Sequence, residues 1–233
     1  MQKALQGIFS LFRKTNPPQK RLARKPWGQS LVEVAITFPL LIMLFSGMVE
    51  FGFMLNTYLS LIDATRQAAR FYSNTNPFTF IDDKTTPPTI VEDPAFYTSV
   101  AAMTRQILEV PGDPYARKVI FNASRDDILV SVLRVKVSDS TNTITAIERF
   151  PAGSSPFRLF GNHSSAYAAD TQVTSLMTKN GTTPIRAGLL IVEVYYDYEG
   201  ILKLPWVEVF MDTITLHASS VMPIVSAKPP RIP

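Results

Sequence analysis

The chain has 233 residues, enough for one sizeable domain with appendages. Its formal net charge of +4 is uneven: residues 1–28 hold seven Lys or Arg and no acid, which leaves 16 basic and 19 acidic side chains in the rest. This mildly acidic body argues against nucleic-acid binding, which needs clustered cations. The absence of cysteine excludes disulfides, thiolate metal sites and cysteine nucleophiles.

A long apolar stretch follows the basic leader. The 16 residues from Val34 to Val49 carry no charge, and 12 of them are apolar. As a helix they span about 24 Å, and apolar neighbours on both sides extend them to the roughly 30 Å of a hydrocarbon core. A helix that is apolar on every face needs lipid or protein around it. The stretch predicts one transmembrane helix, with a buried helix of a soluble protein as the alternative.

The distribution of cations predicts the orientation of this helix. Seven basic residues precede it, whereas the first ones after it are Arg66 and Arg70. By the positive-inside rule, the N-terminus stays in the cytoplasm and the rest of the chain is exported. The stretch is longer than the apolar part of a secretory signal, and no small-x-small site follows it closely, so we expect the helix to stay attached.

The boundary between the leader and the helix has two interpretations. Ser30 and Glu33 have the spacing of a capping box, in which both side chains satisfy free N–H groups of a helix start. Alternatively, Gly28, which ends the leader, and Glu33, five residues beyond it, are parts of one recognition site. This arrangement resembles the processing site of type IV prepilins. The resemblance implies that a prepilin peptidase cuts after Gly28, that the mature chain begins at Gln29, and that Glu33 pairs with a neighbouring subunit's new α-amino group to set the register of assembly.

The resemblance becomes closer along the segment from Gly28 to Tyr72, which is similar to the TadE-like minor pilins of Tad/Flp (tight adherence) pili. The residues that carry it are Gly28, Glu33, Pro39, Gly47, Glu50, Phe51, Gly52, Arg66, Ala68, Ala69 and Arg70. Val34 stands where the major Flp pilin has an aromatic residue, and the body is far longer than that small pilin. Both departures favour a minor, pseudopilin-type subunit.

This resemblance also implies partners and a location. The expected partners are the cytoplasmic membrane, a prepilin peptidase, other pilins and the Tad assembly platform proteins, with no cofactor, nucleic acid or small-molecule substrate. The expected location is the cytoplasmic membrane in a single pass, with possible incorporation into a surface pilus. Val34, Pro39, Gly47, Val49 and Glu50 are assigned to the membrane helix.

Beyond the span, an apolar stripe recurs in steps of four and three residues. Its members are Phe51, Leu55, Tyr58, Ile62, Thr65, Ala69 and Tyr72. This spacing places one helix face against a partner, which is either the exported domain or another subunit. Glu50 and Asp63 fall off the stripe.

The fold class is predicted as α+β: a long transmembrane helix, then an exported domain with a mainly antiparallel sheet and two or more short helices. The proposed division is a leader at 1–28, the helix and its extension at 29–73, a Pro- and Thr-rich linker at 74–94 and the exported domain at 95–233. Helical patterns cover 95–110 and 163–177, a turn covers 122–127, and strand patterns cover 118–122, 128–137, 143–150, 188–198 and 207–219.

No sequence motif of a hydrolase, nucleotide-binding protein or metalloprotease is present. His163 and His217 lack metal-site spacing, and the paired acids Asp82-Asp83 and Asp126-Asp127 are interpreted as solvated turn residues. We expect a non-enzymatic assembly protein. The alternatives are an uncleaved, single-pass membrane-anchored surface-binding protein and, less favoured, an anchored enzyme.

Overall fold

The computed structural model describes residues 27–82, 89–109, 119–138, 140–152, 156–179, 183–184, 188–208, 213–224 and 227. The chain divides into two units, residues 1–44 and residues 45–233. The described part of the first unit, from residue 27 on, is entirely helical.

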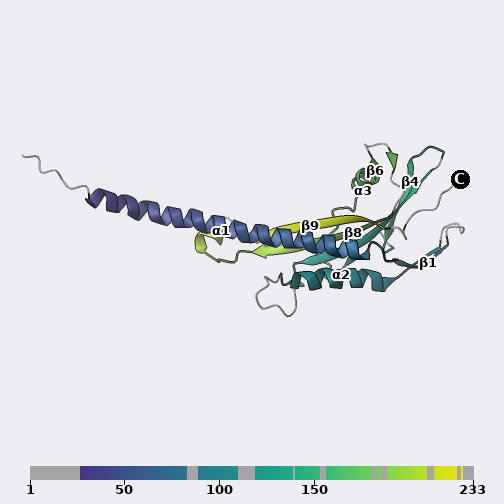
Figure 1. The fold of residues 1–233 in the computed structure, drawn as a ribbon, viewed down its shortest axis with the longest axis horizontal. Coiled ribbons are helices and arrows are strands. Elements are labelled where there is room, and N and C mark those ends of the chain that lie inside the picture. Colours follow the sequence, from purple (N-terminus) through teal and green to yellow (C-terminus); the bar gives the residue numbers. More distant parts are fainter. Residues whose placement is uncertain are drawn as a thin grey trace, which may run out of the picture. The chain divides into compact units, whose positions relative to one another are not determined.

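Helix α1 (Trp27–Tyr72) is the longest element, with 46 residues and Pro39 inside it (Figure 1). Its part from Ser30 on is long and apolar enough to cross a membrane, as predicted. The helix begins three residues before Ser30. The capping-box interpretation is therefore wrong, because Ser30 lies inside the first turn and is not the residue that precedes it.

A five-stranded antiparallel sheet forms the centre of the second unit. It contains β3 (Asp127–Val137), β4 (Ile144–Phe150), β5 (Phe157–Arg158), β8 (Gly188–Glu199) and β9 (Thr213–Ile224). The strand order is β4-β3-β8-β9, and β5 pairs with β3 beside β4. Strands β8 and β9 pair along their whole length, from Gly188 opposite Ile224 to Glu199 opposite Thr213 (Figure 1). The predicted α+β class is confirmed.

Helices cover both faces of this sheet. The buried residues that face α2 (Pro94–Glu109) and the second half of α1 alternate along β3 and β8, and they include Ile128, Val130, Val132, Leu190, Val192 and Val194. The opposite face packs on α3 (Asp170–Met177) through Leu133, Val135, Leu189 and Ile191. Both faces of β3 are therefore buried, and this includes a charged side chain near its end: Arg134 is fully buried 3.7 Å from Glu148.

Several elements differ from the predicted secondary structure. Within residues 74–94, where no element was predicted, the structure contains a hairpin of β1 (Phe78–Asp82) and β2 (Thr89–Glu92), and Phe78 makes an edge-to-face contact with Phe150. Residues 119–122 form no strand, although Val119 and Phe121 are buried and the Val119 N–H donates to the Leu108 carbonyl. Only residues 170–177 of the predicted 163–177 helix are helical.

The last strand also begins later than predicted. Helix α4 (Pro205–Glu208) occupies the expected strand start, and β9 covers 213–224. A second small hairpin joins β6 (Thr178–Lys179) to β7 (Thr183–Pro184). Strands of two to five residues are too short to show a clear periodicity in the sequence.

Candidate membrane and assembly helix

The first half of α1 presents apolar side chains on every side. Every residue from 31 to 45 is exposed, including the predicted membrane residues Val34 and Pro39. Glu33 is exposed among them, and Gly28 is exposed in the first turn. A helix apolar all round is stable only when lipid or other protein surrounds it. In this part of the chain, α1 therefore has the surface of a membrane or filament-core helix.

Helix α1 changes character at Ser46, where it has entered the second unit and its contacts with the rest of that unit begin. Ser46 and Glu50 are buried, and Gly47 and Val49 between them are half-buried. Neither Gly47 nor Gly52 has an atom within 4 Å of the position that a Cβ would take. These glycines leave open surface along the helix, and no neighbour within the protein requires them to be small.

Glu50 is the most informative residue of this region, and the prediction that it lies off the packed face is wrong. It is 0% exposed. Its Oε1 accepts hydrogen bonds from the Tyr198 hydroxyl (2.5 Å) and the Ile201 N–H (2.7 Å), and its Oε2 accepts one from the Leu202 N–H (2.9 Å). A buried carboxylate is tolerated when donors replace its water. Here two of the three donors come from the connection after β8, and the third, Tyr198, lies near the end of β8 itself.

This connection, residues 200–206, is called the 200–206 loop below, and it holds α1 at two points. Gly200 lies against the Glu50 carboxylate, with 3.6 Å between Glu50 Oε1 and the position of a Cβ at residue 200. One turn earlier on α1, the Ser46 hydroxyl accepts a hydrogen bond of 3.0 Å from the Trp206 indole N–H. The loop therefore runs along one turn of α1, from Glu50 back to Ser46.

The packed face of α1 beyond Glu50 is rotated by about one residue from the predicted stripe. Thr57, Leu61, Ala64, Thr65, Ala68 and Ala69 are buried. By contrast, Phe51 and Leu55, the first two members of the stripe, are exposed. Small side chains let a helix approach its neighbours closely, and alanine and threonine make up most of the buried face, together with Leu61. Of the two alternatives for the partner of this face, the buried residues pack on the chain's own domain.

Asp126 and Asp127 were predicted to be solvated turn acids, and this prediction is wrong. Asp127 is fully buried and accepts from the backbone N–H groups of Phe160, Gly161 and His163, at 3.0, 3.1 and 3.1 Å. Asp126 accepts from the N–H groups of Asn122 and Asp197. Burial raises the pKa of the Asp126 carboxyl, although both backbone donors oppose the shift. These acids organise loops and lie in no exposed site.

The two histidines, which are 54 residues apart in sequence, flank one tyrosine. The Tyr195 ring stacks on His163 with 4.6 Å between centroids and on His217 with 4.3 Å. Beside them, buried Glu193 accepts from His217 Nε2 at 3.2 Å and from Ser165. Burial, then the negative charge of Glu193, raises the pKa of Tyr195 to about 12. No cluster of three metal-binding side chains occurs in the described part of the chain.

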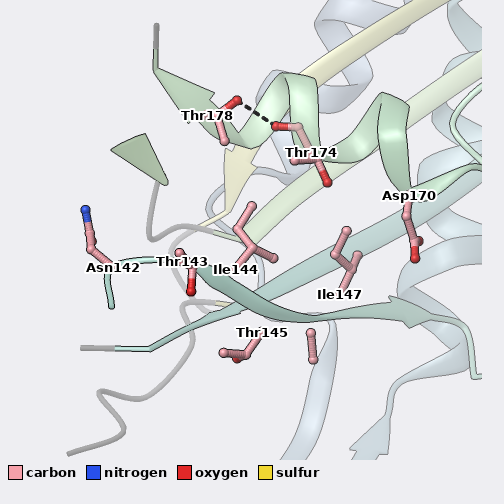
Figure 2. Close-up of a pocket in the computed structure, with 9 residues that line it drawn as sticks. Asn142, Thr143, Ile144, Thr145, Ile147, Asp170, Thr174 and Thr178 are labelled. Carbon is pink, nitrogen blue, oxygen red and sulfur yellow. Dashed lines mark hydrogen bonds between the residues drawn. The ribbon is translucent and has the colours of Figure 1, made fainter. Parts of the chain in front are cut away.

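An open groove of about 390 Å³ lies between β4 and α3. Figure 2 shows the side chains that line it, chiefly threonines and isoleucines. Its lining residues are Asn142, Thr143, Ile144, Thr145, Ala146, Ile147, Asp170, Thr174 and Thr178. The acid among them, Asp170, pairs with Arg149 at 2.6 Å. The lining offers no pair of a nucleophile and a base, so the groove gives no reason to assign a reaction.

Comparison with known proteins identifies the helix and not the domain. The family model of TadE-like protein matches residues 28–70, which is α1 from its second residue into its last turn. No curated protein and no solved structure matches the chain. Residues 28–70 are therefore similar to the TadE-like family, which confirms the predicted resemblance.

Proposed function

We propose that the chain is a minor, pseudopilin-type subunit of a Tad pilus, which acts in pilus assembly or at the pilus tip. The observation that carries the proposal is the coincidence of two ranges. The TadE-like match covers residues 28–70, and within it α1 is exposed and apolar from residue 31 to residue 45. The role is structural, because a filament subunit needs a membrane-soluble helix and a folded head, and no catalytic group.

The helix inserts through the cytoplasmic membrane with its N-terminus inside. The seven cations of residues 1–28 favour this orientation. The second unit then folds on the outer side, where β3, β8 and β9 provide its core. Its partners are the membrane, other pilins and the Tad assembly platform proteins, all of which meet the exposed side of α1.

A prepilin peptidase removes the leader after Gly28, so that the mature chain begins at Gln29. Both residues lie in the first turn of α1, and a protease cleft takes an extended segment. That turn must therefore unwind, which is cheap at a helix end and is made easier by a glycine, at about 0.5–1 kcal/mol relative to alanine.

Glu33 pairs with the freed α-amino group of a neighbouring subunit. Its side chain is exposed, directly before the uncharged run that continues from Val34 to Val49. A charge at the bilayer centre costs about 2.5–3.5 kcal/mol on insertion scales. This cost favours a cationic partner as subunits leave the membrane, and the pairing fixes their register.

Co-expression of the full chain with a prepilin peptidase, followed by N-terminal sequencing, tests the proposal. The expected product starts at Gln29, and the Gly28→Val variant stays uncut because its side chain and β-branching disfavour entry into the cleft. The matched control, Gly52→Val, is cut normally, since Gly52 lies on open helix surface. A chain that keeps Met1 under these conditions contradicts the proposal and favours a membrane-anchored surface-binding protein.

A further inference from the structure

We propose that the 200–206 loop is a membrane-contact surface that docks on the outer headgroup region of the bilayer that α1 crosses. This inference rests on the proposed function, because it needs α1 to span a membrane. The inference adds that the second unit, the folded head, rests against the bilayer. The 200–206 loop lies in the headgroup region and sets the depth to which α1 enters the lipid.

The position of the loop along α1 is the first argument. Helix α1 is continuous, and Glu50 follows Leu31 by 19 residues, which at 1.5 Å per residue is about 29 Å. A hydrocarbon core is about 30 Å thick. When Leu31 is at the inner boundary, Glu50 is therefore at the outer one. The hydrogen bonds from Ile201 and Leu202 to Glu50 hold the loop at that level.

The side chains of the loop are the second argument. Ile201 is 47% exposed although it is aliphatic, and Leu204 and Trp206 are half-buried. Tryptophan is enriched at membrane interfaces because its ring is apolar while its N–H needs a polar partner. The exposed Lys203 has a long apolar stem, and its ammonium can reach lipid phosphates. The composition therefore fits headgroups better than bulk water.

The surface beside the loop is apolar too, and it is continuous with the span. On α1, Phe51 is 55% exposed, and Phe53 and Leu55 are also exposed. Leu59 is 55% exposed as well, whereas the exposed side chains from residue 63 to residue 70 are polar or charged, among them Asp63, Arg66 and Arg70. Exposed apolar side chains of α1 thus continue past Glu50 as far as Leu59.

The backbone of the loop is the third argument. A peptide group needs a hydrogen-bond partner within the hydrocarbon, where there is no water, so a loop at the hydrocarbon edge is favoured when its N–H groups already have partners. The N–H groups of Ile201 and Leu202 are already bonded to the Glu50 carboxylate. In the same way, the Trp206 indole N–H is bonded to Ser46. Glu50 therefore holds the loop on α1. In return, the three donors that bond its carboxylate stabilise the negative charge at the edge of the lipid.

Spin labels at single cysteines test the inference in the full chain reconstituted in vesicles of phosphatidylethanolamine and phosphatidylglycerol. The chain has no native cysteine, so Ile201→Cys, Phe80→Cys and Leu41→Cys each carry one nitroxide. Phe80 is the matched control, since it is 53% exposed and lies on β1, beyond the far end of α1. Leu41 is an exposed residue within the span. Collision with oxygen, which concentrates in lipid, is compared with collision with a water-soluble nickel chelate.

The expected result is a higher ratio of oxygen to nickel collisions at Ile201 than at Phe80, with the highest ratio at Leu41. An Ile201 ratio equal to that of Phe80, with Leu41 deep in lipid, overturns the docked loop and leaves the membrane span intact. A label at Ile201 that is shielded from both reagents also overturns the inference, because protein then covers the loop. A Leu41 label in water overturns the proposed function itself.

Discussion

Replacing Glu50 tests the link between α1 and the head. Its carboxylate accepts three hydrogen bonds, from Tyr198, Ile201 and Leu202. A hydrogen bond to a charged group contributes about 1.5–3 kcal/mol, and a buried donor left without an acceptor costs about 1–3 kcal/mol. Because water enters and the loop relaxes, these amounts do not add fully. For Glu50→Ala we expect the free energy of local opening of the 200–206 loop to fall by about 3 kcal/mol.

Amide hydrogen exchange measures this change where it occurs. A loss of about 3 kcal/mol speeds exchange of the Ile201 and Leu202 amides by about 100-fold, if the opening remains local. Glu50→Gln separates geometry from charge. When its amide oxygen keeps the position of Oε1, its amide nitrogen faces the Leu202 N–H, so two donors meet. We therefore expect Leu202 to lose more protection than Ile201 in this variant.

Asp63→Ala is the matched control on the same helix. Asp63 is exposed, and its carboxylate accepts from Gln67 at 2.7 Å, a surface pair of the kind that contributes only about 0.2–0.5 kcal/mol. Exchange of the loop amides should stay at the parent rate in this control. The reasoning about Glu50 is refuted when Glu50→Ala also leaves both amides within twofold of the parent.

Three further predictions concern other parts of the chain. The variant Glu33→Ala should insert and be cleaved like the parent. It should nevertheless be missing from purified pili on an immunoblot, because it has no carboxylate to pair with the α-amino group of a neighbouring subunit. Incorporation at the level of the parent would contradict the pairing. Gly188→Ala should lower the melting temperature, because a Cβ there would lie 2.3 Å from that of Ala227 and overpacking costs about 1–3 kcal/mol. Its control is Gly52→Ala, which meets no atom within 4 Å and should melt no lower than the parent. Between pH 10 and 12 the stability of the parent should fall, because the pKa of Tyr195 is about 12 in the folded chain, whereas an unperturbed tyrosine loses its proton near 10. Tyr195→Phe should flatten this slope in urea titrations, and equal slopes would argue against the raised pKa.

The sequence was sufficient for elements that long apolar or alternating runs determine. Helix α1, β3 and β8 were predicted to within a few residues, because 16 uncharged residues or a run of Val, Ile and Leu allows few other structures. The TadE-like resemblance also depends on such a local run, and the family match at residues 28–70 bears it out. The processing and pairing functions of Gly28, Gln29 and Glu33, like the four-part division of the chain, remain predictions.

The sequence was insufficient where a residue depends on a partner far along the chain. Glu50 was predicted to lie off the packed face of α1. The donors that bond its carboxylate, from Tyr198 to Leu202, lie 148 to 152 positions later in the chain, where no local pattern points to them. Similarly, His217 meets Tyr195 only through the register of β8 with β9. Asp126 and Asp127 followed a turn pattern, yet their burial depends on the loop at 160–163 and on Asp197. Local patterns contain no signal for such pairs.

The proposed function depends most on the first half of α1 lying in lipid. Alkaline carbonate extraction of membranes from cells that make the full chain tests this directly, since it strips peripheral proteins and leaves spanning helices in the bilayer. We expect the chain to stay in the membrane pellet and to need detergent for release. A chain that is recovered in the carbonate supernatant, soluble without detergent, would contradict it.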